Sequence, residues 1–163
     1  FVNNGFSTIR FNFRGVGKSN GVFDDGEGEL SDAASVLDWL QQYNTNSKIC
    51  WVAGFSFGGW VAMQLLMRRP EINGFVCVSP PANIRDFGFL APCPSSGLIV
   101  HGDKDNIASY DSTKILSEKF QKQKKVEILF KPIKGADHFY ENFKDEFTSI
   151  VDEYIRNKLS ENK

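Results

Sequence analysis

The sequence of 163 residues lacks the features on which several protein classes depend. Its 19 lysine and arginine residues face 20 aspartate and glutamate residues, so a net charge of −1 provides no basic excess for nucleic acid or an anionic membrane surface. No apolar run approaches the ~20 residues that cross a bilayer, and no secretory signal peptide is visible. The sequence therefore predicts neither a nucleic-acid partner nor a membrane partner.

Cysteine is scarce as well, with only Cys50, Cys77 and Cys93. Their number is odd and their spacing is not that of metal ligands. Cys50 and Cys77 lie within apolar runs, where we expect buried thiols. This use of cysteine favours a reducing, cytoplasmic setting.

What the sequence does contain is a regular alternation of short apolar runs and helical patterns. The expected strands are residues 7–13, 49–54, 74–79, 97–101 and 126–130, and the expected helices are residues 30–43, 57–69, 109–121 and 140–159. Ser31 or Asp32 would cap the first of these helices. Strands that are apolar at nearly every position are typical of a parallel sheet buried on both faces. The pattern predicts an α/β fold, a single domain over 1–163 with a doubly wound, mostly parallel sheet and helices on both faces.

One loop at first resembles a phosphate-binding P-loop, because Gly17-Lys18-Ser19 follows the first expected strand. The P-loop pattern requires another glycine five positions before Gly17, and that position holds Asn12. No helix follows directly, and the next residues, "NGVFDDGEGE", carry acidic side chains that would repel a polyphosphate. The sequence therefore favours a surface loop with glycines at turn positions, and its acidic residues are expected to be solvated.

A second glycine-rich stretch, "ICWVAGFSFGGW", carries a stronger signal. It places Gly54, Ser56 and Gly58 in a G-x-S-x-G pattern between an expected strand and an expected helix, which is the context of a nucleophile elbow. We expect Ser56 at a positive φ, with Gly54 and Gly58 required because side chains there would clash. Gly59 would add room on the same side. The turn would direct the Phe57 N–H at the reaction centre as an oxyanion donor.

A serine nucleophile needs a base, and the sequence has only two histidines. His138 lies after the last expected strand, whereas His101 ends the fourth strand and is less able to face Ser56. Asp103 and Asp105 follow that fourth strand, so either could orient the base. The order serine, aspartate, histidine is the order that a nucleophile elbow predicts.

These stretches together resemble the α/β-hydrolase-fold serine hydrolases. The chain is most similar to small, cap-less bacterial members related to dienelactone hydrolases and serine aminopeptidase-like proteins. "FNFRGVGKSNG" resembles the family loop R-G-x-G-x-S-x-G, "GFSFGG" the elbow, "HGDKD" the acid loop and "GADHF" the histidine loop. The resemblance implies Asp105 as the catalytic acid and His138 as the base. It also implies that Arg14 shapes one wall near the active site, where Glu29 would brace it, and that Lys18 is a solvated charge.

The implied chemistry is acyl transfer to Ser56, without a metal or organic cofactor. The 17 residues between the third and fourth expected strands leave no room for a lid. A small ester or thioester is therefore the expected acyl substrate. The aromatic residues expected to line an acyl site are Phe55, Phe57, Phe87, Phe89 and Phe139. A non-catalytic binding protein remains the alternative, and a peptidase or nucleotide-binding protein is less favoured.

The resemblance also implies that the chain is an interior piece of a longer protein, since it starts at Phe1 rather than Met. In the family a further central strand separates the strands corresponding to residues 7–13 and 49–54. The loop after that strand supplies the second oxyanion donor. Either upstream residues complete the sheet, or these two strands pair directly.

Overall fold

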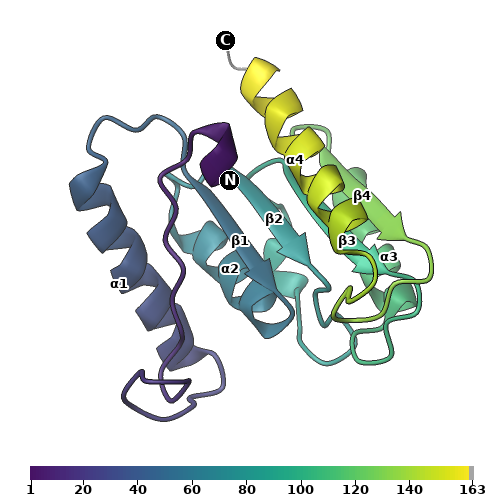
Figure 1. The fold of residues 1–163 in the computed structure, drawn as a ribbon, viewed down its shortest axis with the longest axis horizontal. Coiled ribbons are helices and arrows are strands. Elements are labelled where there is room, and N and C mark those ends of the chain that lie inside the picture. The colour runs from purple at the N-terminus through teal and green to yellow at the C-terminus, as the bar shows by residue number, and fades with distance from the viewer. Residues whose placement is uncertain (162–163) are drawn as a thin grey trace.

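The computed structural model describes residues 1–161, and its centre is a parallel sheet of four strands in the order β1-β2-β3-β4. The strands are β1 Trp51–Phe55, β2 Gly74–Val78, β3 Gly97–Gly102 and β4 Ile128–Ile133 (Figure 1). Neighbouring strands pair in parallel along the whole sheet. The predicted α/β class with a parallel sheet is confirmed.

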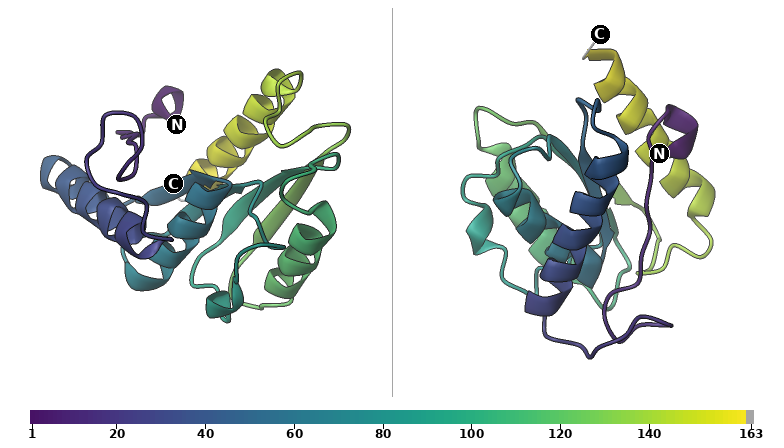
Figure 2. Two further views of the ribbon diagram at one scale, coloured as in Figure 1. Left: turned by 90° about the horizontal axis from the view of Figure 1, so that it is seen from below. Right: turned by 90° about the vertical axis from the view of Figure 1, so that its left-hand side faces the viewer.

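Helices cover both faces of this sheet, as the alternation predicted (Figure 2). The helices are α1 Glu27–Tyr43, α2 Phe57–Arg68, α3 Tyr110–Gln121 and α4 Lys144–Glu161, with short 3-10 turns η1 Val2–Asn4 and η2 Gly88–Leu90. Helices α2 and α3 pack on one face and α4 packs on the other, while α1 packs against α2.

Two hydrophobic cores result from the alternation of side chains along the strands. On β2, Phe75 and Cys77 belong to the core under α2 and α3, whereas Val76 and Val78 belong to the core under α4. Every residue of β2 and β3 is buried. The continuous apolar runs of these strands are thus explained by burial on both faces.

Residues 7–13 do not form the expected first strand. The segment is extended and runs along the molecule in front of α1 (Figure 1), but it is not part of the four-stranded sheet. Among the described residues, the N–H groups of 7–13 donate no hydrogen bond, and the segment does not pair with β1. A strand exists only through partners, so an apolar run without a paired neighbour remains irregular.

Aromatic contacts nevertheless hold the N-terminal segment to the domain. Trp51 at the start of β1 contacts Phe6 at a ring separation of 5.7 Å and Tyr154 of α4 at 5.7 Å. Phe1 packs edge-on against Trp51, and the Asn4 amide donates to the carboxylate of Asp152. The segment is therefore placed by side chains at its start rather than by sheet hydrogen bonds.

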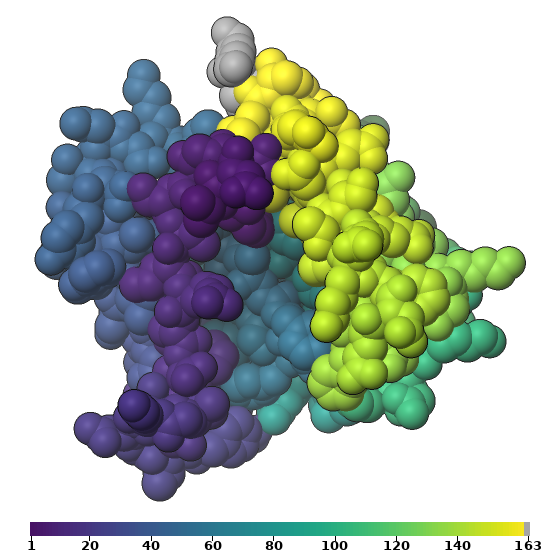
Figure 3. Space-filling view, in the orientation of Figure 1, coloured from purple at the N-terminus to yellow at the C-terminus, as the bar shows by residue number. Residues whose placement is uncertain are grey.

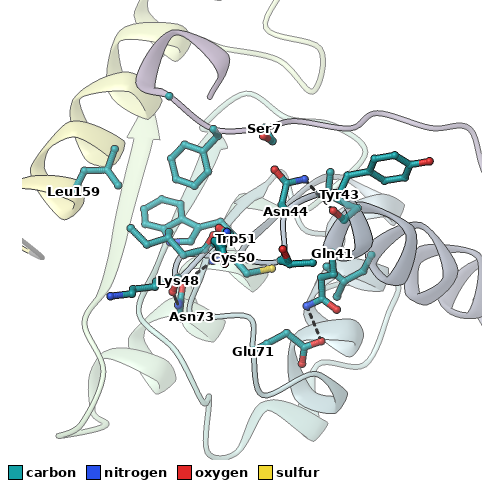
Figure 4. Close-up of a pocket in the computed structure, with 18 of the residues that line it drawn as sticks. Ser7, Gln41, Tyr43, Asn44, Lys48, Cys50, Trp51, Glu71, Asn73 and Leu159 are labelled. Atoms are coloured by element: carbon teal, nitrogen blue, oxygen red, sulfur yellow. Dashed lines mark hydrogen bonds between the residues drawn. The ribbon is translucent and has the colours of Figure 1, made fainter.

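A cavity of about 900 Å³ lies beside this segment. Figure 3 shows the face on which the start of the N-terminal segment lies beside α4, and Figure 4 shows side chains that line the cavity. It is lined by residues such as Ser7, Gln41 and Asn44, and by Trp51 at the amino end of β1. Ser56 follows the opposite end of β1, roughly 15 Å away at about 3.3 Å per residue. This cavity is therefore separate from the predicted nucleophile.

The start of α1 differs from the prediction. The helix begins at Glu27, with Gly26 as its N-cap at φ 106°, so neither Ser31 nor Asp32 caps it. The Glu29 carboxylate accepts hydrogen bonds from the N–H groups of Asp24 and Gly26. Asp24, Asp25 and Glu27 are exposed as expected, but Glu29 is only 1% exposed, so the expectation of a solvated acidic stretch is wrong for Glu29 alone. Burial would raise the pKa of Glu29, but these backbone donors outweigh it and lower the pKa below its ordinary value.

The three cysteines are free thiols. Cys77 and Cys93 are buried, and Cys50 is half-buried. Burial raises the pKa of Cys77 to about 12, which keeps it protonated and unreactive.

Across residues 1–161, no helix combines the length and the apolar character that a membrane span requires.

Candidate active site

The turn between β1 and α2 has the strained geometry that the sequence predicted. Ser56 adopts φ 51° and ψ −121°, and its N–H donates to the Val78 carbonyl at 2.8 Å. A non-glycine residue at positive φ persists only where its surroundings hold it. In the described part of the chain the Phe57 N–H has no hydrogen-bond partner, so it is free to donate at the N-terminus of α2.

The glycines of this turn have different roles from those expected. A Cβ at Gly54 would lie 2.2 Å from the Gly58 carbonyl oxygen, so Gly54 is required. A Cβ at Gly58 would meet nothing closer than Phe13, at 3.9 Å, and the expected clash there is wrong. A Cβ at Gly59 would lie 2.9 Å from the Cys77 sulfur, so the second close approach of strand and helix falls at Gly59.

Asp105 and His138 lie together at the carboxyl edge of the sheet. Asp105 follows β3 and His138 follows β4, and His138 Nδ1 lies 2.7 Å from Asp105 Oδ2. The Asp105 side chain is fully buried and His138 is 4% exposed. Because the carboxylate accepts from Nδ1–H, Nε2 is left as the nitrogen that can take a proton.

The Asp105 carboxylate is held ionised by its surroundings. Its Oδ1 accepts hydrogen bonds from the N–H groups of Ile107 and Ala108, at 2.9 and 2.8 Å. Burial by itself would raise the pKa of Asp105, but the hydrogen bonds from His138 and from these two amides outweigh it. The pKa of Asp105 is therefore lowered, and the carboxylate is charged at neutral pH.

Asp103, the alternative acid, does not face His138. Its Oδ1 accepts a hydrogen bond of 2.6 Å from the Gly135 N–H, three residues before His138. The Lys104 N–H donates to the Ala136 carbonyl, and a Cβ at Gly102 would lie 2.3 Å from that same oxygen. The loop after β3 and the loop after β4 are thus joined by backbone contacts as well as by the Asp105–His138 pair.

His101, the alternative base, is buried beneath the acid loop. Its Nε2 lies 3.0 Å from the Ala108 carbonyl and 3.5 Å from Asp105 Oδ2, while its buried Nδ1 has no partner. Burial lowers the pKa of His101, against the opposing effects of Ala108 and Asp105. Because Nε2 donates to the Ala108 carbonyl, the nitrogen left to take a proton is Nδ1, which is fully buried and forms no hydrogen bond with Ser56 in residues 1–161, so His101 is not placed as its base.

A buried hydroxyl pair anchors the histidine loop, and the sequence offered no signal for it. Ser79 Oγ lies 2.7 Å from the Tyr140 hydroxyl, which also lies 3.4 Å from the Val100 carbonyl. Ser79 and Tyr140 both adopt positive φ values, 45° and 55°. Burial raises the pKa of Tyr140 to about 12, although the hydrogen bond with Ser79 opposes the rise. Tyr140 thereby ties the loop two residues after His138 to the ends of β2 and β3.

The loop that resembled a P-loop lies against the elbow. Phe13 and Phe23, which border it, contact the Phe57 ring at 6.0 and 5.6 Å. Arg14 pairs with Asp32 of α1 through both Nε and Nη2, so Asp32 rather than Glu29 braces it. Lys18 is exposed, as expected.

The five phenylalanines expected at the acyl site fall into different environments. Phe87 is 5% exposed, and Phe89 stacks on it and packs against the core beneath α2 and α3. These two are core residues and line no acyl site. Phe55 and Phe139 are 42% and 59% exposed and contact the His138 ring at 4.8 and 5.2 Å.

Phe55, which precedes Ser56, contacts the His138 ring at 4.8 Å, but within residues 1–161 no hydrogen bond joins the Ser56 hydroxyl to His138. Such contacts are often long without substrate and shorten in the complex. No group of three or more histidine, cysteine, aspartate or glutamate side chains in the described residues could hold a metal ion.

The parallel sheet, the strained serine turn and the buried aspartate–histidine pair define an α/β serine hydrolase fold of the cap-less type. A family model for the X-Pro dipeptidyl-peptidases (S15 family) matches residues 1–90, and the chain belongs to this family of α/β serine hydrolases.

Known relatives and solved structures agree with this assignment. The chain is 50% identical over 158 residues to the Rickettsia prowazekii protein RP471, covering 94% of this chain and 66% of RP471. Its sequence is 52% identical to that of ATU1826 from Agrobacterium tumefaciens, a protein of unknown function whose crystal structure is known. The two structures match with a TM-score of 0.94, over 97% of this chain and 72% of ATU1826. XC6422 from Xanthomonas campestris, a serine hydrolase without a lid, is 29% identical with a TM-score of 0.78 over 91% of this chain and 65% of its own.

Proposed function

We propose that the protein hydrolyses small esters or thioesters through an acyl-enzyme on Ser56. His138 is the general base, Asp105 orients it, and the Phe57 N–H stabilises the oxyanion. The observation that carries the proposal is the 2.7 Å contact between His138 Nδ1 and Asp105 Oδ2, next to Phe55, the residue that precedes a serine at positive φ. A structural turn would require neither the strained serine nor a buried charge beside a histidine.

In the first half of the reaction, His138 Nε2 takes the Ser56 hydroxyl proton as Oγ attacks the substrate carbonyl. The negative charge moves to the carbonyl oxygen, which the Phe57 N–H can reach from the N-terminus of α2. His138 then donates the proton to the leaving alcohol or thiol. Asp105 remains ionised throughout, because its backbone donors hold the charge.

In the second half, a water molecule takes the place of the alcohol. His138 removes its proton, the water oxygen attacks the acyl carbonyl, and the bond to Ser56 Oγ breaks with return of the proton. Asp105 keeps Nδ1 protonated in both halves, so Nε2 alternates between base and acid.

A fluorophosphonate probe tests this proposal directly, since it labels only an activated serine. We expect the wild-type protein to be labelled and Ser56→Ala to be unlabelled, with hydrolysis of short p-nitrophenyl esters reduced by about 10⁴-fold or more. Ser79→Ala serves as the matched control, because Ser79 also sits at positive φ but pairs with Tyr140. Equal labelling of wild type and Ser56→Ala would refute the serine mechanism.

A non-catalytic binding protein is the second candidate. It is supported by one feature of the described residues, in which Ser56 and His138 are not joined by a hydrogen bond. It predicts a protein that binds acyl compounds but shows neither labelling nor turnover, so the same probe separates the two functions.

A further inference from the structure

Two exposed phenylalanine rings enclose the His138 imidazole from different parts of the chain. Phe55 ends β1 and lies 4.8 Å from the His138 ring, and Phe139 lies 5.2 Å from it in an edge-on arrangement. The two phenyl rings are 6.2 Å apart, so each contacts the other as well. His138 itself is 4% exposed, whereas the two rings that contact it are 42% and 59% exposed.

The exposure of Phe139 is imposed by the loop and does not reflect a loose segment. Asp137 Oδ1 accepts hydrogen bonds from the N–H groups of Phe139 and Tyr140, and Tyr140 is anchored to Ser79. Tyr140, at φ 55°, is 5% exposed, whereas Phe139 immediately before it is 59% exposed. Phe139 therefore presents its ring to solvent at a defined place.

Phe55 is equally well fixed. It pairs with Val78 in the register of β1 and β2, and the next residue, Ser56, donates its N–H to the Val78 carbonyl. Single exposed apolar residues are normal on protein surfaces, but two fixed aromatic rings in mutual contact beside a candidate catalytic histidine form a binding surface.

The chemistry of acyl transfer decides which part of a substrate meets this surface. His138 must donate a proton to the leaving oxygen, so the alcohol part of an ester has to lie beside the imidazole. The acyl part lies on the Ser56 and Phe57 side. We propose that Phe55 and Phe139 form a leaving-group subsite for aromatic alcohols, so that the preferred substrates are esters of benzyl-type or phenyl-type alcohols. This inference rests on the proposed hydrolase function and specifies the substrate class of that same site.

The test compares benzyl acetate with methyl acetate, which share the acyl group and have alcohols of similar acidity. We expect wild type to favour the benzyl ester in kcat/KM, and Phe139→Ala to lower the benzyl-to-methyl ratio about 10-fold. Phe139→Leu, which keeps apolar bulk but lacks the ring, should lower the ratio by less. Tyr43→Ala, which removes an exposed ring of α1, should leave the ratio unchanged. An unchanged ratio in Phe139→Ala would overturn the inference, even if both rates fall together.

A binding measurement keeps this test separate from that of catalysis. Benzyl alcohol is titrated into the Ser56→Ala protein while NMR signals of Phe139 and His138 are followed. We expect saturable shifts that disappear in the Ser56→Ala, Phe139→Ala double variant. If wild type hydrolyses neither ester, the proposed function fails, and the titration alone decides the subsite. No saturable shift in the Ser56→Ala protein would overturn it.

Discussion

The two halves of the candidate site are built very differently. The acid and histidine follow β3 and β4 and are connected by contacts between their loops, including the Gly135 N–H to Asp103 and the Lys104 N–H to Ala136. The serine follows β1, which within residues 1–161 has a sheet partner only on the β2 side and whose residues are exposed or half-buried. Its other neighbour, the segment 7–13, contributes aromatic contacts through Phe13 but no sheet hydrogen bonds.

This difference separates two ways of positioning a catalytic group. The acid–histidine half is held by hydrogen bonds in a buried setting, where each unpaired group costs roughly 1–3 kcal/mol and the geometry is therefore well defined. The serine half is held by the hydrogen bond from the Ser56 N–H to the Val78 carbonyl and by the close approach of Gly54 to Gly58. We expect substitutions in the first half to alter proton transfer and substitutions in the second to alter the fold.

In the acid–histidine half, a large effect on the reaction rate is expected. Asp105→Asn should reduce kcat for a short ester by about 10³–10⁴-fold, because an amide no longer stabilises the charged imidazole or selects its tautomer. The protein should still fold, since the size of the side chain is retained. Asp103→Asn is the control and should stay within about 10-fold of wild type, because its amide oxygen can still accept from Gly135. A greater loss in Asp103→Asn than in Asp105→Asn would reverse the assignment of the acid.

In the serine half, the expected effect is on stability. Gly54→Ala places a Cβ 2.2 Å from a backbone oxygen that cannot move away cheaply, and we expect a loss of about 3 kcal/mol or more in the free energy of unfolding. Gly58→Ala, with 3.9 Å of room, should range from no change to a gain of about 1 kcal/mol, since alanine favours helix. Urea unfolding of both variants measures the difference. Equal destabilisation would show that the elbow is not held by this close approach.

A smaller effect is expected from the hydroxyl pair behind the histidine loop. Tyr140→Phe leaves the Ser79 hydroxyl buried without its partner, which should cost about 1–3 kcal/mol. Tyr43→Phe, at an exposed tyrosine, should change stability by less than about 0.5 kcal/mol. If Tyr140→Phe unfolds at the same urea concentration as wild type, the pair is not an anchor.

The smallest effect concerns the pH dependence of stability, through His101. Its folded pKa is lowered, so below the ordinary value of about 6.5 the unfolded chain binds this proton more readily than the folded protein. His101 should therefore reduce stability progressively as the pH falls from about 6.5 towards its folded pKa, by at most about 1.4 kcal/mol per pH unit. His101→Gln keeps a donor for the Ala108 carbonyl and should remove this component of the slope. Identical slopes for the two proteins between pH 7 and 5 would contradict the assignment.

The linear order of residues was enough to predict the parts of the site that depend on local pattern. The G-x-S-x-G stretch between a strand and a helix predicted the positive φ of Ser56, because the turn is a local backbone event. Strand–helix alternation predicted that residues after β1, β3 and β4 reach one edge, because parallel strands share their carboxyl ends. The assignments of Asp105 and His138 as catalytic residues stay predictions until the variants above are measured.

The sequence by itself determined the α/β class, the serine turn and the order of the candidate residues, since each follows from the spacing of neighbours along the chain. Only the tertiary structure decided what depends on distant partners. Residues 7–13 form no strand because they lack a paired neighbour. It is Gly59, and not Gly58, that closely approaches Cys77. The Glu29 carboxylate is buried and accepts a hydrogen bond from a backbone N–H group. Phe87 enters the core while Phe139 remains exposed, although both are phenylalanines in loops. Burial and hydrogen-bond pairing are properties of the assembled chain, and composition alone does not specify which of two similar side chains receives them.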